Sequence, residues 1–265
     1  MAEKAKSSGV VRRALLMMAV IHQAYEQYAR PRWPIVLPRP YRMTQVFAGK
    51  AYSGEQSPLA FLAESEREAV LAFRGTIRTD EWVSDGVVRQ IACPFAPRMG
   101  LVHEGFADIY ESMRAKIKEA FADVAPAKTL YITGHSLGGA LAVLAAADLA
   151  SGGRRPVVYT FGAPRAGDPR FVWRYGALIS ESYRIVNRCD LVPRLPPPVW
   201  WSPATNAFYF YRHVPRAIRV EFGSSRSPGS HSLRGYFRAL ALRDPAYAAS
   251  LGAIFDEEED RRPRA

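Results

Sequence analysis

Long hydrophobic runs are missing from this 265-residue sequence. A membrane-spanning helix needs roughly 18 to 20 consecutive apolar residues, and no stretch reaches that length. Residues 14–21, which follow two arginines, are apolar enough to suggest a signal peptide, but they lead into a polar stretch without a small-residue cleavage site. Leu15, Met18, Ile21 and Tyr25 fall on one helical face, which predicts an amphipathic helix of the folded domain. We therefore expect a cytoplasmic or leaderless protein, with secretion left open.

Cysteine is also scarce. Only Cys93 and Cys189 are present, and neither belongs to a Cys/His pattern with zinc-ligand spacing. Two cysteines do not make a disulfide framework, although they leave one disulfide open. Cys189 lies in an apolar, strand-like segment, so we expect it to be a small buried residue.

Concentrated basic runs are absent, although the net charge is +11. The arginines are scattered, and no basic-aromatic module typical of nucleic-acid binding is visible, so no nucleic-acid partner is expected. Two interpretations stay open for the positive charge. One is a solvated basic surface, and the other is transient attraction to anionic lipid surfaces. Oligomeric state cannot be predicted from these features.

The composition is that of a folded globule, with 48% hydrophobic and 23% charged residues. A chain of this length suits one α/β domain over residues 1–265, with frayed ends at 1–9 and 257–265.

The motif Gly-His-Ser-Leu-Gly at residues 134–138 follows a short β-prone run and precedes an alanine- and leucine-rich stretch. This order predicts a strand, a sharp turn and a buried helix, which is the setting of a nucleophile elbow. Ser136 would be the nucleophile, and Gly134 and Gly138 provide the space that the turn requires. The alternative is an ordinary serine in a glycine-rich connection.

A second hydrogen-bond donor is expected where the predicted strand 69–73 leads into Arg74-Gly75-Thr76. The amides of Thr76 and Leu137 would then form an oxyanion hole, unless the Gly-Thr pair is a plain turn. The residues that follow, 77–83, predict either a mobile flap over the site or a static helix buried by Trp82.

Two aspartates are candidates for the acid. Asp190 follows the predicted strand 183–188, where catalytic groups of open α/β sheets gather, and a histidine partner would stabilise its carboxylate. The alternative partner is Arg188 or Arg194 in a salt bridge. Asp168 precedes a proline and a predicted helix, so we interpret it first as an N-cap and only second as the acid.

Three histidines are candidates for the base. His103 precedes the serine, whereas the α/β-hydrolase order is serine, acid, histidine, so we expect His103 to be structural. His213 lies within a predicted hairpin of residues 208–213 and 217–222 and is expected on a strand. His231 follows a polar loop late in the chain and can face the serine, so we predict it as the base.

Together these motifs resemble the fungal-type, or class 3, lipase family of the α/β-hydrolases. The resemblance rests on residues 73–76, 102–106, 133–139, 160–165 and 187–193, and on His231 with Tyr236 after it. It implies that Ser136 is the nucleophile, Asp190 the acid and His231 the base.

The resemblance also implies an α/β-hydrolase fold, with a central, mostly parallel sheet, helices on both faces and a short helical lid near residues 77–83. Thr76 and Leu137 would form the oxyanion hole. Family members hydrolyse carboxylic esters, commonly of acylglycerols, without a cofactor or metal. Esterase or phospholipase activity and non-catalytic lipid binding stay as alternatives. Secreted fungal members usually carry a signal peptide and several disulfides, which this sequence does not show, and residues 196–211 look longer than the family core requires.

Overall fold

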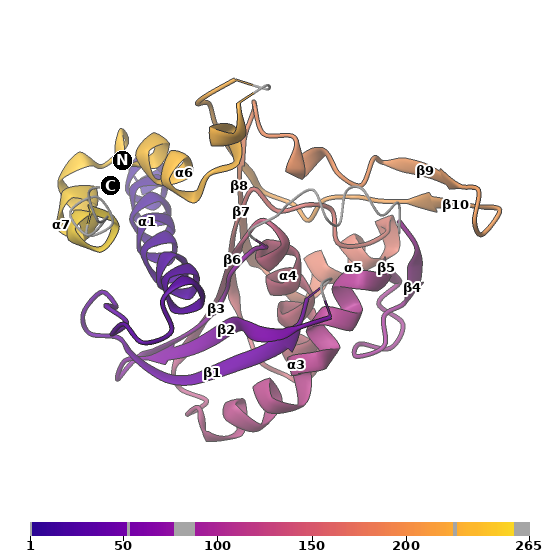
Figure 1. Cartoon of the computed structure of the whole chain (residues 1–265), viewed down its shortest axis with the longest axis horizontal. Helices are drawn as coiled ribbons and strands as arrows, with labels where there is room; N and C mark the ends of the chain where they lie inside the picture. The colour runs from indigo at the N-terminus through magenta and orange to yellow at the C-terminus, as the bar shows by residue number, and fades with distance from the viewer. Residues whose placement is uncertain (1, 52–53, 77–87, 225–226, 257–265) are drawn as a thin grey trace.

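A seven-stranded sheet separates two layers of helices (Figure 1). The computed structural model describes residues 2–51, 54–76, 88–224 and 227–256. The strands of the sheet, in spatial order, are β1 (Arg42–Lys50), β2 (Gln56–Glu64), β3 (Glu68–Phe73), β6 (Thr129–His135), β7 (Val157–Phe161), β8 (Glu181–Asn187) and β11 (Ala217–Val220). Strands β3, β6, β7, β8 and β11 run parallel to one another, and β1 and β2 extend the sheet antiparallel at one edge.

The central strands are buried on both faces, which explains their nearly continuous apolar sequences. Strands β2 and β3 form an antiparallel hairpin, with Phe61 opposite Ala72 and Leu62 opposite Leu71, and β3 confirms the strand predicted at residues 69–73. Strand β6 lies between β3 and β7, in parallel with both. The carboxyl ends of these strands and of β8 therefore meet at one edge of the sheet, where Thr76 follows β3, Ser136 follows β6 and Asp190 follows β8.

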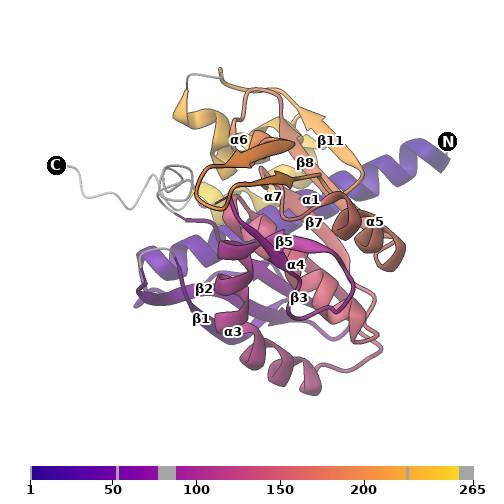
Figure 2. The same cartoon turned by 90° about the vertical axis from the view of Figure 1, so that its right-hand side faces the viewer.

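One face of the sheet is covered by α1 (Ala2–Ala29), α6 (Leu233–Ala241) and α7 (Pro245–Asp256), and the other by α3 (Glu104–Asp123), α4 (Leu137–Ser151) and α5 (Pro169–Leu178) (Figures 1 and 2). Each layer has its own apolar core against the sheet. Helix α1 confirms the amphipathic helix predicted around residues 14–25. It begins at Ala2, inside the terminal segment that we expected to be frayed.

Helix α4 is buried along almost its whole length, and most of its residues are alanine or leucine. Asp148 is the exception, because it places a carboxylate in this apolar layer with 5% exposure. The carboxylate accepts hydrogen bonds from the Tyr110 hydroxyl at 2.9 Å and from Nε and Nη2 of Arg114 at 2.7 and 3.1 Å. Both partners belong to α3, so the pair of helices is joined by one buried polar contact.

A separate two-stranded sheet is formed by β9 (Val199–Ser202) and β10 (Ala207–Phe210), which project from the body beyond β8 (Figure 1). The predicted hairpin between residues 208–213 and 217–222 is therefore wrong. Strand β10 pairs with the preceding β9, and β11 pairs in parallel with β8 at the edge of the main sheet. Alternation of apolar and polar residues indicates a strand but does not identify its partner.

Three further expectations have mixed outcomes. Both cysteines are free, and Cys189 lies half-buried in the turn after β8, not inside a strand. No helix within the described residues is long and apolar enough to cross a membrane. The proposed lid at 77–83 lies outside the described residues, as does the segment 257–265.

Candidate active site

The turn between β6 and α4 places Ser136 in a backbone conformation that side chains rarely adopt. Its φ is +56° and its ψ is −132°, and the residue is fully buried. A Cβ at Gly134 would lie 2.1 Å from the carbonyl oxygen of Gly138, and a Cβ at Gly138 would lie 2.4 Å from that of Arg74. Both positions therefore require glycine, as the tight turn of a nucleophile elbow does.

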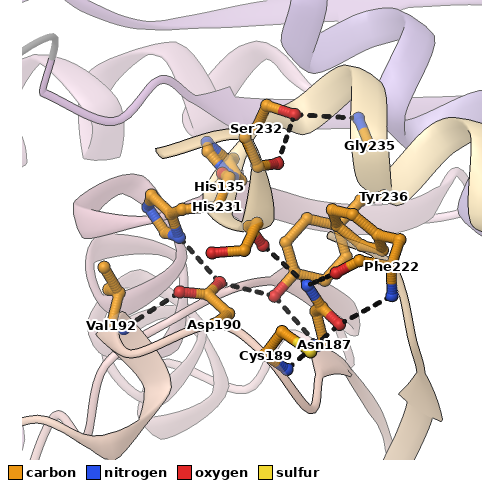
Figure 3. A network of polar contacts seen from close by, with 12 residues as sticks. His135, Asn187, Cys189, Asp190, Val192, Phe222, His231, Ser232, Gly235 and Tyr236 are labelled. Carbon is orange, nitrogen blue, oxygen red and sulfur yellow. Dashed lines mark hydrogen bonds and ion pairs between the residues drawn. The ribbon is translucent and has the colours of Figure 1, made fainter. Parts of the chain in front are cut away.

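Asp190 and His231 are in direct contact, as Figure 3 shows. Oδ2 of Asp190 lies 2.7 Å from Nδ1 of His231 and accepts a second hydrogen bond from the Tyr236 hydroxyl at 2.7 Å. Oδ1 accepts from the Val192 amide at 2.9 Å. The carboxylate is 1% exposed, and Arg188 pairs with Glu221 instead. A carboxylate that accepts from Nδ1 holds the imidazole in the tautomer with an unprotonated Nε2.

The loop that carries His231 is fastened by the side chain of Asn187 at the end of β8 (Figure 3). Its Nδ2 donates to the carbonyl oxygen of Ser230 at 2.8 Å and to that of Phe222 at 2.9 Å. Its Oδ1 accepts from the amides of Phe222 at 3.1 Å and Cys189 at 3.3 Å. One buried amide thus joins the segment before Asp190 to the segment before His231.

His135 connects three parts of the site. The carbonyl oxygen of His231 can only accept, so the 2.8 Å contact from His135 Nε2 requires a proton on that nitrogen. The amide of Gly75 donates to the Tyr25 hydroxyl at 2.9 Å, and that hydroxyl donates to Nδ1 of His135 at 2.8 Å. Burial, together with the charge of a neighbouring His231, holds the pKa of His135 well below its ordinary value. The ring is therefore neutral, and its tautomer is fixed by its two partners.

The residues after β3 are also held firmly. Arg74 is 3% exposed and donates from Nη1 to the carbonyl oxygen of Gly75 at 2.8 Å and from Nε to that of Pro58 at 2.6 Å. Because a trans peptide is planar, fixing the Gly75 carbonyl directs the amide of Thr76 to the opposite side. Leu137 is the first residue of α4, and the first amides of a helix have no partner within that helix.

Three buried polar atoms of the site have no hydrogen-bond partner among the described residues: Oγ of Ser136, Nε2 of His231 and Oγ1 of Thr76. The serine and the histidine do not bond to each other in this structure, but they lie close together. The Ser136 amide donates to the carbonyl oxygen of Phe161 at 2.9 Å. A Cβ on the next residue, Gly162, would lie 3.1 Å from Cε1 of His231 and 2.9 Å from Asp190. A hydroxyl, an imidazole and a carboxylate in this order can carry out nucleophilic acyl transfer.

Other candidate residues take structural positions. Asp168 is the N-cap of α5 and accepts from the Phe171 amide at 2.6 Å, as we expected first. His103 is the N-cap of α3, and burial lowers its pKa to about 4. His213 lies outside the strands, where its Nε2 donates to the Pro193 carbonyl oxygen at 2.6 Å. Burial and the nearby Arg184 charge lower the pKa of His213 to about 3.

Sequence reasoning missed the roles of Tyr25 and His135. Tyr25 was assigned only to the apolar face of a helix, because nothing in the spacing indicates that its hydroxyl reaches Gly75. His135 was read as a motif position without a partner. No group of three or more histidine, cysteine or acidic side chains in the described part of the chain is placed to hold a metal ion.

The fold and the strand-turn-helix at Ser136 define the class: an α/β-hydrolase, as predicted. Residues 70–200, just under half of the chain, match the family model described as Lipase (class 3), in agreement with the resemblance found in the sequence. The chain is 35% identical over 149 residues to the secreted mono- and diacylglycerol lipase 1 of Fusarium solani, covering 55% of this chain and 44% of that protein. It is 32% identical over 168 residues to a lipase of Rhizomucor miehei, covering 59% and 46%.

A solved structure of the Rhizomucor miehei lipase propeptide complex, a deletion mutant, is similar with a TM-score of 0.65 and 22% identity. The match covers 88% of this chain and 78% of that chain, and it supports the fold alone. The chain spans less than half the length of the two sequence relatives. The Fusarium relative is named as secreted, which does not fit well with the cytoplasmic expectation. That expectation stays a prediction, as does a single domain.

Proposed function

We propose that this protein is a serine hydrolase that cleaves carboxylic esters of acylglycerols through an acyl-enzyme intermediate. The observation that supports this most is the 2.7 Å contact between Asp190 and His231, which leaves the buried Nε2 of the imidazole without a partner among the described residues. A base with one nitrogen held by a carboxylate and the other unpaired is what a serine nucleophile needs.

In the proposed reaction, Nε2 of His231 takes the proton of the Ser136 hydroxyl while Oγ attacks the ester carbonyl carbon. Asp190 holds the tautomer and stabilises the imidazolium that forms. The imidazolium then gives its proton to the departing alcohol oxygen, and an ester of Ser136 with the acyl group is left. Water, activated by the same nitrogen, releases the fatty acid and restores the hydroxyl.

The negative charge that develops on the carbonyl oxygen is stabilised by the amides of Thr76 and Leu137, with the Thr76 hydroxyl as a third donor. Its Oγ1 is buried and without a partner among the described residues, which supports this role. Each donor of this kind contributes about 100- to 1000-fold in rate. The rigid hold of Arg74 and Tyr25 on Gly75 keeps the Thr76 amide in place before substrate arrives.

The first test is Ser136→Ala, assayed on emulsified acylglycerols and on short soluble esters. We expect kcat to fall at least about 1000-fold with unchanged folding, because the nucleophile is lost. Full activity in this variant would refute the assignment of the nucleophile.

The second test separates catalysis from passive binding of lipid. A fluorophosphonate probe should label the wild-type protein at Ser136 and should not label Ser136→Ala. Absence of labelling in the folded wild-type protein would favour a lipid-binding protein without turnover. A panel of acylglycerols, phospholipids and short esters then decides between lipase, phospholipase and esterase, because all three use the same triad chemistry.

A further inference from the structure

The hairpin of β9 and β10 exposes four large apolar side chains. Val199 and Trp201 on β9 are 52% and 43% exposed, and Phe208 and Phe210 on β10 are 60% and 51% exposed. The residues between them, Trp200 and Tyr209, are only partly exposed. The exposed and covered positions therefore alternate along both strands, but the exposed set is the apolar one, contrary to the usual pattern of a surface hairpin.

The register places all four side chains on one face of the hairpin. Val199 is paired with Phe210, and Trp201 with Phe208, and directly opposed residues of an antiparallel pair lie on the same face. The rings of Trp201 and Phe208 lie 4.8 Å apart between centroids. We call these four residues the apolar face of the hairpin.

The hairpin is fastened to the part of the chain that carries the site. The amide of Tyr211 donates to the carbonyl oxygen of Pro198 at 2.9 Å, and Gln90 donates from Nε2 to that of Phe210 at 2.8 Å. Arg165 donates from Nη1 to the carbonyl oxygen of Pro196 at 2.6 Å. Strand β9 begins nine residues after Asp190, so the hairpin extends from the segment that supplies the proposed acid.

The segment of the chain that carries the apolar face has charged residues of one sign only. Residues 191–220 contain no aspartate or glutamate. They contain four arginines, all of them exposed: Arg194, Arg212, Arg216 and Arg219. Exposed aromatic side chains that are flanked by cations match a surface with an apolar interior and anionic headgroups.

The size of the apolar face indicates whether it binds a second copy of this chain or a lipid surface. Three aromatic side chains of about 150–250 Å² each, roughly half exposed, together with a valine leave about 300–400 Å² of apolar surface. A stable protein interface needs about 800 Å² from each partner. The face is thus too small to hold a second copy of this chain by itself, and the arginines of the segment 191–220 would repel the same segment of such a copy.

We propose that the apolar face of the hairpin inserts into the surface of an anionic lipid layer and holds the protein there, with the arginines contacting the headgroups. This proposal rests on the proposed function in one respect: docking would bring the site to esters embedded in lipid. Docking itself needs neither turnover nor the Ser136 hydroxyl.

The test is flotation with vesicles of phosphatidylcholine alone and of phosphatidylcholine mixed with phosphatidylglycerol. The variant is Trp201→Ser with Phe208→Ser, and the matched control is Trp173→Ser, since Trp173 is 66% exposed on α5, outside the hairpin. We expect the hairpin variant to bind mixed vesicles at least about 10-fold more weakly, because two inserted rings are lost. The control should stay within about twofold of wild type.

Three results would overturn the proposal: equal binding by wild type and hairpin variant, equal loss in the control, or a wild-type dimer in sedimentation that the hairpin variant abolishes. Circular dichroism and thermal unfolding provide the check on folding, and they should be the same in wild type, variant and control, as should any hydrolysis of a short soluble ester. If no protein hydrolyses any ester but the hairpin variant still loses vesicle binding, the proposed function fails and the docking surface stands. Added salt should weaken binding to mixed vesicles only.

Discussion

The hydroxyl of Tyr25 offers a sharp test of how the oxyanion hole is held. In Tyr25→Phe the ring stays, but the amide of Gly75 and Nδ1 of His135 both lose their partner, at 2.9 and 2.8 Å in the wild type. Each buried polar group without a partner costs about 1–3 kcal/mol. For the two groups together we therefore expect the free energy of unfolding to fall by about 2–6 kcal/mol, measured by urea denaturation.

The same change should reduce catalysis. Gly75 precedes Thr76 directly, and its carbonyl is still held by Arg74 at 2.8 Å, so the Thr76 amide becomes misaligned without being lost. We expect kcat to fall about 10- to 100-fold, less than the loss of a whole donor, while KM changes less than about threefold. The Thr76 amide stabilises the charge that develops in the transition state, so its misalignment lowers kcat and has little effect on KM.

Tyr175→Phe is the matched control for this experiment. The Tyr175 hydroxyl is buried and lies 3.0 Å from Oγ of Ser182, without any contact to the site residues named above. Its removal should lower stability by about 1 kcal/mol and leave kcat unchanged. Our account of the oxyanion hole would be refuted if Tyr25→Phe lost stability but kept kcat within about twofold of wild type at a temperature where both are folded.

The other predictions concern a cap, a glycine and a titrating group. Asp168→Ala should lower stability by about 1 kcal/mol through the lost N-cap and leave kcat unchanged; an inactive but folded variant would make Asp168 the acid. Gly138→Ala should cost about 1–3 kcal/mol in thermal unfolding and slow ester hydrolysis, because its Cβ would lie 2.4 Å from the Arg74 carbonyl oxygen. The lowered pKa of His103, about 4, means that the unfolded chain binds a proton below pH 6.5 that the folded one does not. Stability should thus fall from about pH 6.5 towards 4. His103→Asn keeps a capping oxygen and should reduce that slope by about 1.4 kcal/mol per pH unit; an unchanged slope in urea titrations would exclude His103 as the source.

The elbow was predictable because its constraints are local. A serine at positive φ between a strand and a helix needs glycines at fixed positions, and the sequence around Ser136 displays them. The order of Asp190 and His231 after it followed from the ends of parallel strands. Their contact in the structure agrees with that order, although their catalytic roles are still a prediction.

Long-range partners were not predictable in this way. The hydroxyl of Tyr25 reaches Gly75 from 50 residues away, and no periodicity in either segment indicates that distance. Strand β11 has the same alternation as β10, yet one joins β8 in parallel and the other forms the projecting hairpin. Which strand pairs with which depends on the path of the connecting chain, and this path is not specified by β-propensity or by the alternation of apolar and polar residues.

The buried carboxylate of Asp148 has a consequence for Ser136, although it lies 12 residues further along α4, or about 18 Å at 1.5 Å per residue. Contacts between alanine and leucine surfaces are nearly direction-free, so such a helix can slide or rotate by small amounts at little cost. A carboxylate bonded to Tyr110 and Arg114 admits only one axial and rotational setting. The C-terminal part of α4 is therefore fixed in position against α3. Because the helix is rigid, the same contact fixes the position of Ser136 at its N-terminus.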